Sequence, residues 1–193
     1  MRPDEALVAD RFRDVVTSEA QLRSIIGRPS YWLQGKILTR LNGRCRRFVA
    51  ASPFVVLASV GAGGSVDVSP KGDPAGFVRI IDDTTLAVPD QPGNRRVDTF
   101  QNILGNSNVG LIFFVPGRRE TLRVAGRGAI VRDLDLRRAT SVAGRVPELA
   151  LVVSVERAFF HCGRCVARGQ LWGSHAPAAE PEDIAEGDLD VRL

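Results

Sequence analysis

Two short groups of residues have the types and spacing of a phosphate-binding site. Ser69-Pro70-Lys71-Gly72 ends one predicted strand, and Gly93-Asn94-Arg95-Arg96 follows another. Each group combines glycine, a small polar side chain and a cation. Turn amides and hydroxyls can donate hydrogen bonds to phosphate oxygens, while lysine or arginine neutralises their charge. A predicted helix that begins near Val97 would add its positive N-terminal end. The segment 67–110 therefore predicts a phosphate site.

Each group also has a purely structural explanation. A lysine in a turn is most often solvated, and Gly93-Asn94 favours a turn for steric reasons alone. Because the two groups lie on neighbouring predicted strands, their combination favours the phosphate site over two unrelated turns.

A second candidate lies near the C-terminus, in His161-Cys162-Gly163-Arg164-Cys165. As a zinc site it supplies at most three close ligands. As a dithiol redox pair it lacks the strand–helix–strand context of thioredoxin-like motifs. A helical turn after the last strand explains it more simply. We expect no metal site, and the odd cysteine count argues against a disulfide framework.

The elements that must position these groups are mainly strands. Apolar runs and alternation predict an antiparallel β-barrel with flanking helices. Asn42-Gly43 is expected to end the second helix. The predicted strands cover 54–60, 65–69, 77–81, 84–88, 109–115, 120–131 and 150–160, and the predicted helices cover 4–26, 32–41, 44–51, 98–104 and 134–140. On the longest strand, Leu122, Val124, Gly126, Gly128 and Ile130 should share one face, and Thr121, Arg123 and Arg127 the other.

The domain organisation follows from these elements. Residues 1–51 form a helical N-terminal flank, 52–173 the barrel, and 174–193 an acidic tail with few apolar residues that is expected to be mobile.

Composition excludes several classes of protein. No apolar run reaches the roughly 18 residues of a membrane span, and the charged N-terminus lacks a signal-peptide core; a cytoplasmic location is expected. The net charge of +4 comes almost entirely from scattered arginines, and aromatic residues make up only 6%. Without a basic–aromatic pattern, no nucleic-acid partner is expected.

The sequence resembles the pyridoxamine 5′-phosphate oxidase-like superfamily of FMN-binding split barrels, within a subgroup described only as FMN-dependent enzymes. The resemblance covers about residues 30–172. The residues that carry it are SPFVVLAS (52–59), DVSPKGDPAGFVRIIDD (67–83), TLAVPDQPGNRRVDTFQNIL (85–104), VGLIFFVPG (109–117), ETLRVAGRG (120–128), FFHCGRC (159–165) and Leu171-Trp172.

The resemblance implies a homodimer with a flavin at the subunit interface. The strand end that would run beside FMN and reach its phosphate consists of Val68, Ser69, Pro70 and Lys71. A second turn that would also contact the phosphate contains Asn94 and Arg95. The polar strand face that would meet the flavin across the dimer carries Thr121 and Arg123. A weaker implication places His161 and Cys162 in the substrate pocket. Arg118 is a weak candidate for the same pocket because it follows the Pro116-Gly117 turn. The Arg-x-His element that holds substrate phosphate in the oxidases is missing, because Cys165 and Val166 follow Arg164.

The expected function is flavin-dependent oxidoreduction, with hydride passing between flavin and a small organic substrate or NAD(P)H. Two alternatives remain open: a flavin- or haem-binding module without turnover, and a reductase that uses a deazaflavin. The sequence leaves the substrate and the electron donor unassigned.

Overall fold

The structure is a computed structural model that describes residues 12–29, 36–93 and 95–173. The chain divides into two compact units, residues 1–35 and 36–193. In the smaller unit, helix α1 (Glu19–Ile26) begins at Ser18, whose side chain accepts a hydrogen bond from the Gln21 N–H, and ends at Gly27. Residues 12–18 are not helical, so the helix predicted over 4–26 is too long within the described residues. The predicted division at residues 51 and 173 stays a prediction.

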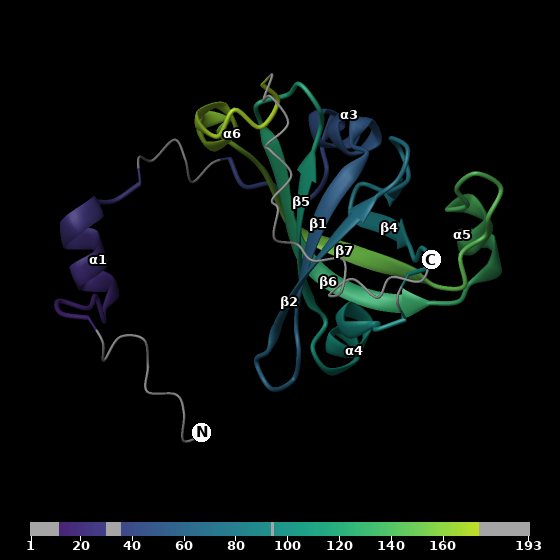
Figure 1. Ribbon diagram of the computed structural model, residues 1–193, viewed down its shortest axis with the longest axis horizontal. Helices are drawn as coiled ribbons and strands as arrows, with labels where there is room; N and C mark the ends of the chain where they lie inside the picture. Colours follow the sequence, from purple (N-terminus) through teal and green to yellow (C-terminus); the bar gives the residue numbers. More distant parts are fainter. Residues whose placement is uncertain (1–11, 30–35, 94, 174–193) are drawn as a thin grey trace, which may run out of the picture. The chain divides into compact units, whose positions relative to one another are not determined.

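The larger unit is built on a seven-stranded antiparallel sheet (Figure 1), which confirms the predicted mainly β split barrel. The strand order is β2-β1-β5-β6-β7-β4-β3, so β2 and β3 are the edge strands. The strands are β1 (Phe54–Val60), β2 (Val66–Gly72), β3 (Arg79–Asp82), β4 (Thr85–Pro89), β5 (Asn108–Phe114), β6 (Thr121–Val131) and β7 (Ala150–His161).

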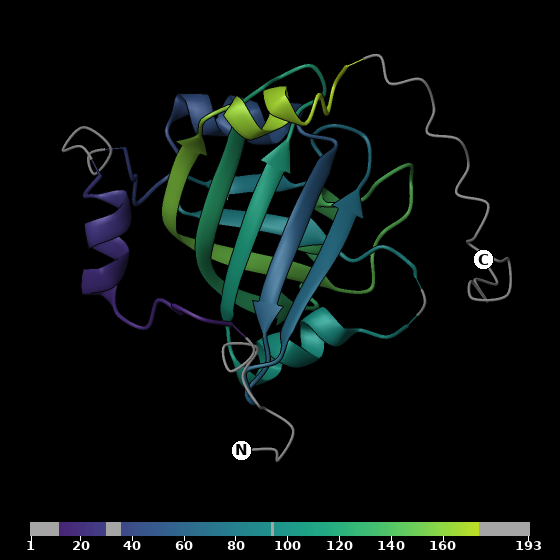
Figure 2. The ribbon, with the colours of Figure 1, turned by 60° about the vertical axis from the view of Figure 1, so that its left-hand side comes forward.

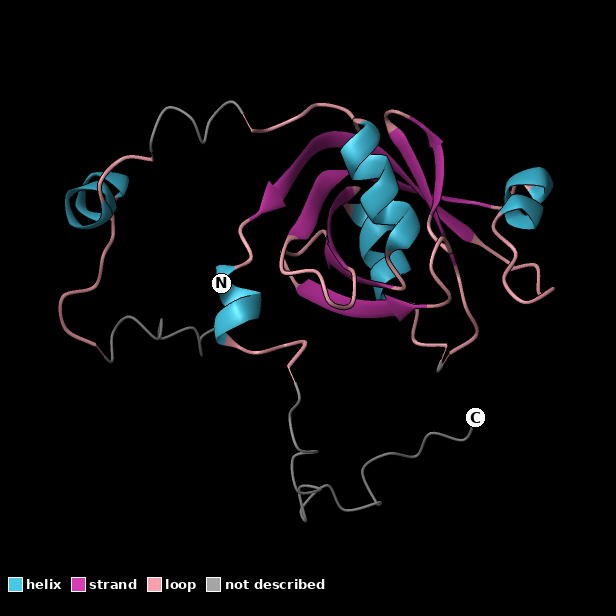
Figure 3. Cartoon of the chain, turned by 90° about the horizontal axis from the view of Figure 1, so that it is seen from above, coloured by secondary structure: helices cyan, strands magenta, loops and turns pink. Residues whose placement is uncertain are grey.

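The sheet curls into a barrel (Figure 3), and the residues in its interior form an apolar core. Alternate side chains of each central strand point inward, as period-2 patterning predicts. On β6, Leu122 and Val124 are buried whereas Arg123 and Arg127 are exposed, which confirms the predicted faces. Thr121 is the exception, because it is buried as well. The core also contains Val55, Leu57, Leu86, Leu111, Phe113, Leu151 and Val153.

A β-bulge lies in the longest strand pair, where the register between β6 and β7 shifts at Ala125/Gly126. A side chain at Gly126 would collide with the backbone oxygen of Ser154. Glycine is therefore required here by the close approach of the two strands rather than by backbone dihedrals.

Helix α3 (Gly43–Ala51) confirms the helix predicted over 44–51. The preceding helix, predicted over 32–41, is wrong for residues 36–41, where Leu38 instead forms a β-bridge with Ala158; residues 30–35 lie outside the described part of the chain. Asn42 begins α3 rather than ending a helix, because its side chain accepts a hydrogen bond from the Cys45 N–H. Asparagine suits either end of a helix, so its type alone did not decide the direction.

The remaining helices are α4 (Asp98–Gly105), α5 (Leu134–Ala139) and α6 (Arg164–Arg168). Figures 1 and 2 show α3 and α6 at one end of the barrel and α4 at the opposite end. No helix in the described residues is long and apolar enough to cross a membrane.

Candidate functional site: a cationic cleft beside an edge strand

Lys71 lies on strand β2 and not in a turn as predicted. The strand pairs with β1 along its whole length, with Val55 opposite Lys71 and Val56 opposite Pro70. Proline is tolerated here because β2 is an edge strand, whose outer N–H groups need no partner in the sheet. The prediction ended the strand at the proline, which would be correct for a central strand.

The two faces of β2 differ in chemistry. Three partly buried polar residues alternate with apolar residues that are exposed. The polar set is Asp67, Ser69 and Lys71; the apolar set is Val66, Val68 and Pro70. The edge strand thus presents a polar face on one side and an apolar face on the other.

A cleft of about 660 Å³ lies between β2, residues 90–93 and 95–97 of the following connection, and the start of α4. This volume is in the range typical of sites for small ligands, roughly 300–1,000 Å³. Its lining includes five predicted cofactor-binding residues: Val68, Ser69, Pro70, Lys71 and Arg95. Asn94, the sixth residue predicted from this segment, lies outside the described residues.

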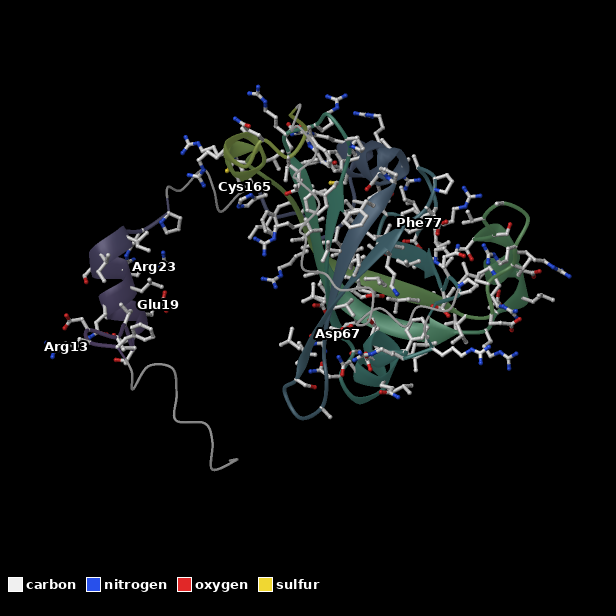
Figure 4. All side chains as sticks on the ribbon, in the orientation of Figure 1. Arg13, Glu19, Arg23, Asp67, Phe77 and Cys165 are labelled. Carbon is white, nitrogen blue, oxygen red and sulfur yellow. The ribbon has the colours of Figure 1, made fainter. Side chains whose placement is uncertain are left out.

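Helix α4 closes the cleft and is anchored on both sides. The Thr99 hydroxyl donates a 2.6 Å hydrogen bond to Asp67 of β2. The Asn102 amide donates a 3.1 Å hydrogen bond to Ser59 of β1. Phe100 and Ile103 are buried in the core. Figure 4 labels Asp67 at the foot of β2 beside α4. These contacts hold the start of the helix against the polar face of β2.

The start of α4 is suited to an anion. The first N–H groups of a helix have no partner inside it, and within the described residues no side chain caps α4 at Val97. Val97 and Arg95 both adopt the left-handed backbone region, with φ of 53° and 62°. That conformation is strained for a β-branched residue and clusters at binding sites. Arg96 forms a 2.8 Å ion pair with Asp98 of the first turn.

Asp90 is a residue of the cleft that the sequence analysis did not select. It follows β4, and its N–H donates a 3.0 Å hydrogen bond to the Leu149 carbonyl oxygen. Burial raises the pKa of the Asp90 carboxyl above the ordinary 3.8, and the positive charge of Lys71 opposes the rise. The signal in the sequence that could have pointed to Asp90 is its position directly after a buried strand. Its burial beside Lys71 could not be predicted, because that burial depends on the pairing of β4 with β7.

The cleft therefore combines three cations with a hydroxyl and an uncapped helix start. Lys71, Arg95 and Arg96 supply the positive charge. Two of the three carboxylates nearby already have partners, since Asp67 accepts from Thr99 and Asp98 pairs with Arg96. Such a set of groups can hold a phosphate or another compact anion.

The other predicted site residues do not line this cleft. Thr121 and Arg123 are on β6, opposite His161 and Phe159 of β7. The Arg123 guanidinium lies 5.2 Å from the centre of the Phe159 ring. Arg118 is in the β5–β6 turn, and Cys162 precedes α6; both are exposed. α6 is the helical turn that the simpler explanation of the Cys-x-x-Cys segment required.

Comparison with known proteins gives the same family as the resemblance seen in the sequence. The family model described as pyridoxamine 5′-phosphate oxidase matches residues 41–162, and a search of curated proteins gave no match. Among solved structures, a variant of HupZ from Group A Streptococcus has a TM-score of 0.51 at 20% identity and covers 63% of this chain and 99% of its own. A candidate pyridoxamine 5′-phosphate oxidase from Lactobacillus delbrueckii has a TM-score of 0.51 at 20% identity, covering 63% and 95%.

These structures share the split-barrel fold with this chain. The family match spans well over half of the sequence, from Leu41 at the start of the barrel unit to Cys162 after β7. It includes β2, the connection 90–97 and all of α4, which together form the cleft. The chain belongs to the pyridoxamine 5′-phosphate oxidase family.

Proposed function

We propose that this protein binds FMN non-covalently in the cleft between β2 and α4 and is a flavin-dependent oxidoreductase acting on a small organic substrate. The observation that carries the proposal is the convergence of Lys71, Arg95 and the uncapped start of α4 on one cleft. Members of this family bind FMN, and a phosphate monoester is the kind of anion that this set of donors fits.

In this proposal the cleft residues bind and orient the cofactor. Lys71 and Arg95 neutralise the phosphate charge, and Asn94 contributes its amide. Ser69 and the backbone of residues 68–71 face the ring, because β2 is an edge strand with N–H groups that the sheet leaves free. The bound flavin would supply hydride transfer with a substrate or NAD(P)H, while the protein supplies position and electrostatics.

A second part of the proposal is a homodimer with the flavin at its interface. The outer face of the sheet carries a continuous apolar patch across β2, β1 and β5, formed by Phe54, Val56, Val66, Val68, Pro70, Ile112 and Phe114. Val66 is 69% exposed and Val68 60% exposed. Exposed apolar patches of this kind mark interfaces. Because β2 contributes to both the patch and the cleft, a second copy packed on the patch would lie beside the flavin. Its Arg123, which is exposed on β6, would be available to contact the cofactor, whereas Thr121 is buried within its own protomer.

The cofactor assignment is tested by the absorbance spectrum of freshly purified protein, with mass analysis of the released cofactor. The proposal predicts a flavin spectrum, a released mass of FMN, and reduction by NAD(P)H followed by oxidation with an added substrate faster than with oxygen. A flavin that NAD(P)H reduces, but that no added substrate reoxidises faster than oxygen does, would instead favour a carrier module. A colourless protein that binds added deazaflavin would favour a deazaflavin-dependent reductase. A haem spectrum would overturn the FMN assignment.

The dimer is tested by Val68→Asp, which puts a charge into the apolar patch. Light scattering should give a dimer mass for the wild type and a monomer mass for the variant, with weakened flavin binding. Ile81→Asp, at an exposed apolar residue of edge strand β3, is the matched control and should stay dimeric. Equal masses for all three proteins would contradict the proposed interface.

A further inference from the structure

The barrel end opposite α4 carries a group of exposed arginines that the cleft does not use. Arg118 and Arg119 lie in the β5–β6 turn, and Arg164 and Arg168 lie in α6; we call these four residues the arginine surface. Within the described residues, no carboxylate pairs with any of the four. In the sequence the two pairs are separated by more than 40 residues and look like ordinary solvated arginines.

Packing brings the two pairs together. A Cβ built on Gly163, just before α6, would lie 2.5 Å from Arg119 Cβ and 2.8 Å from the Arg119 carbonyl oxygen. The Trp172 indole N–H donates a 2.6 Å hydrogen bond to the Arg118 carbonyl oxygen. Val166 of α6 is buried. The turn and α6 therefore form one surface, and Figure 4 shows nitrogen-tipped side chains gathered at this end of the barrel, near the labelled Cys165.

Neighbouring arginines at this end of the barrel already have partners. Arg44 of α3 forms a 2.7 Å ion pair with Glu120 and lies 4.0 Å from the Phe160 ring centre. Arg46 forms a 2.6 Å ion pair with Asp83. Glu120 and Asp83 are thus already paired, and the residues that the structure describes leave the four positive charges of the arginine surface without a carboxylate partner.

The chain leaves the described structure on this surface. Trp172 is fixed to Arg118, and the 20 residues that follow Gly173 include one arginine, Arg192, and six carboxylates: Glu180, Glu182, Asp183, Glu186, Asp188 and Asp190. Their formal net charge is 1 − 6 = −5. Glu180 is seven residues from Gly173, a span of up to roughly 25 Å when extended. A tethered segment of this length has an effective concentration in the millimolar range.

We propose that the acidic segment 180–190 binds the arginine surface of its own chain. Each exposed ion pair contributes little by itself, but several carboxylates on one tether would meet four guanidiniums that have no carboxylate partner in the described part of the chain. Occupying the surface screens it from other polyanions, such as nucleic acid, which a bare arginine cluster would attract. This inference does not depend on the cofactor.

Zero-length cross-linking tests the contact directly. The chain has only two lysines, Lys36 and Lys71, so Arg164→Lys adds a single amine to the arginine surface while keeping its charge. Carbodiimide treatment should join that amine to a carboxylate of 180–190 in a product of single-chain mass. Arg145→Lys, at an exposed arginine between α5 and β7, is the matched control and should give several-fold less of this product. Sodium chloride at about 0.5 M, where screening acts within roughly 5 Å, should reduce the yield from Arg164→Lys.

A full-length variant with the six carboxylates changed to amides provides the second measurement. It should lose the cross-link and bind a heparin oligosaccharide about tenfold more tightly than the wild type, because a tethered competitor has been removed. Equal yields from Arg164→Lys and Arg145→Lys, or heparin affinity unchanged by the amides, would overturn the proposal. A cross-linked product of doubled mass would assign the segment to a second copy and overturn the binding within one chain.

Discussion

Replacing Lys71 by alanine should weaken FMN binding at least tenfold. Lys71 is partly buried on the polar face of β2 and lines the cleft. A hydrogen bond between charged groups contributes about 1.5–3 kcal/mol, and partial exposure reduces this toward the lower end. A loss of about 1.4 kcal/mol corresponds to the tenfold change.

The same substitution has a second effect, through Asp90. The Lys71 charge opposes the rise that burial causes in the pKa of the Asp90 carboxyl. Without Lys71 that pKa rises further, so more Asp90 is protonated at low pH, and a protonated Asp90 repels a bound phosphate less. The loss of affinity in Lys71→Ala should therefore be larger at about pH 8 than at about pH 5, where Asp90 carries its proton in a larger fraction of molecules.

The assay is the quenching of FMN fluorescence on titration with apoprotein at both pH values. Lys36→Ala removes the other lysine, which is exposed and does not line the cleft, and should bind FMN like the wild type. Lys71→Arg should recover most of the affinity. If Lys71→Ala and Lys36→Ala bind FMN equally well, Lys71 does not hold the phosphate and the reasoning fails.

Three further predictions concern stability and reactivity. Because folding raises the pKa of Asp90, the folded state binds the extra proton, and stability falls as pH rises from 3.8 through the folded pKa; Asp90→Asn should remove this fall in urea unfolding measured across that pH range. Gly126→Ala should destabilise the barrel by at least about 2 kcal/mol, since the new methyl meets the Ser154 oxygen, whereas Gly110→Ala, with open space around it, should cost less than half as much in the same urea titration. Cys45 is buried, and burial raises the pKa of its thiol. A thiol reagent should therefore label the exposed Cys162 and Cys165 rapidly in the native protein and Cys45 only after unfolding. Equal labelling rates for all three cysteines would contradict the buried position of Cys45.

The strands and most helices could be predicted from the sequence because their signals are local. Alternation along β6 and the apolar run of β1 are properties of neighbouring residues, and a half-buried strand needs no distant information to be recognised. The helix predicted over 32–41 is wrong over residues 36–41 because Leu38 pairs with Ala158, 120 residues away in the chain. Periodicity over ten residues does not contain that contact.

The sequence by itself determined the chemistry of the site: a lysine, an arginine and small polar residues on two segments separated by about 20 residues. Only the tertiary structure decided how they are arranged. Pairing of β2 with β1 placed Lys71 in an edge strand, and the contacts of α4 with Asp67 and Ser59 closed the cleft. Distant contacts also decide the burial of Asp90 and the gathering of the four arginines on one surface. Burial and charge density come from packing, which composition and spacing do not reveal.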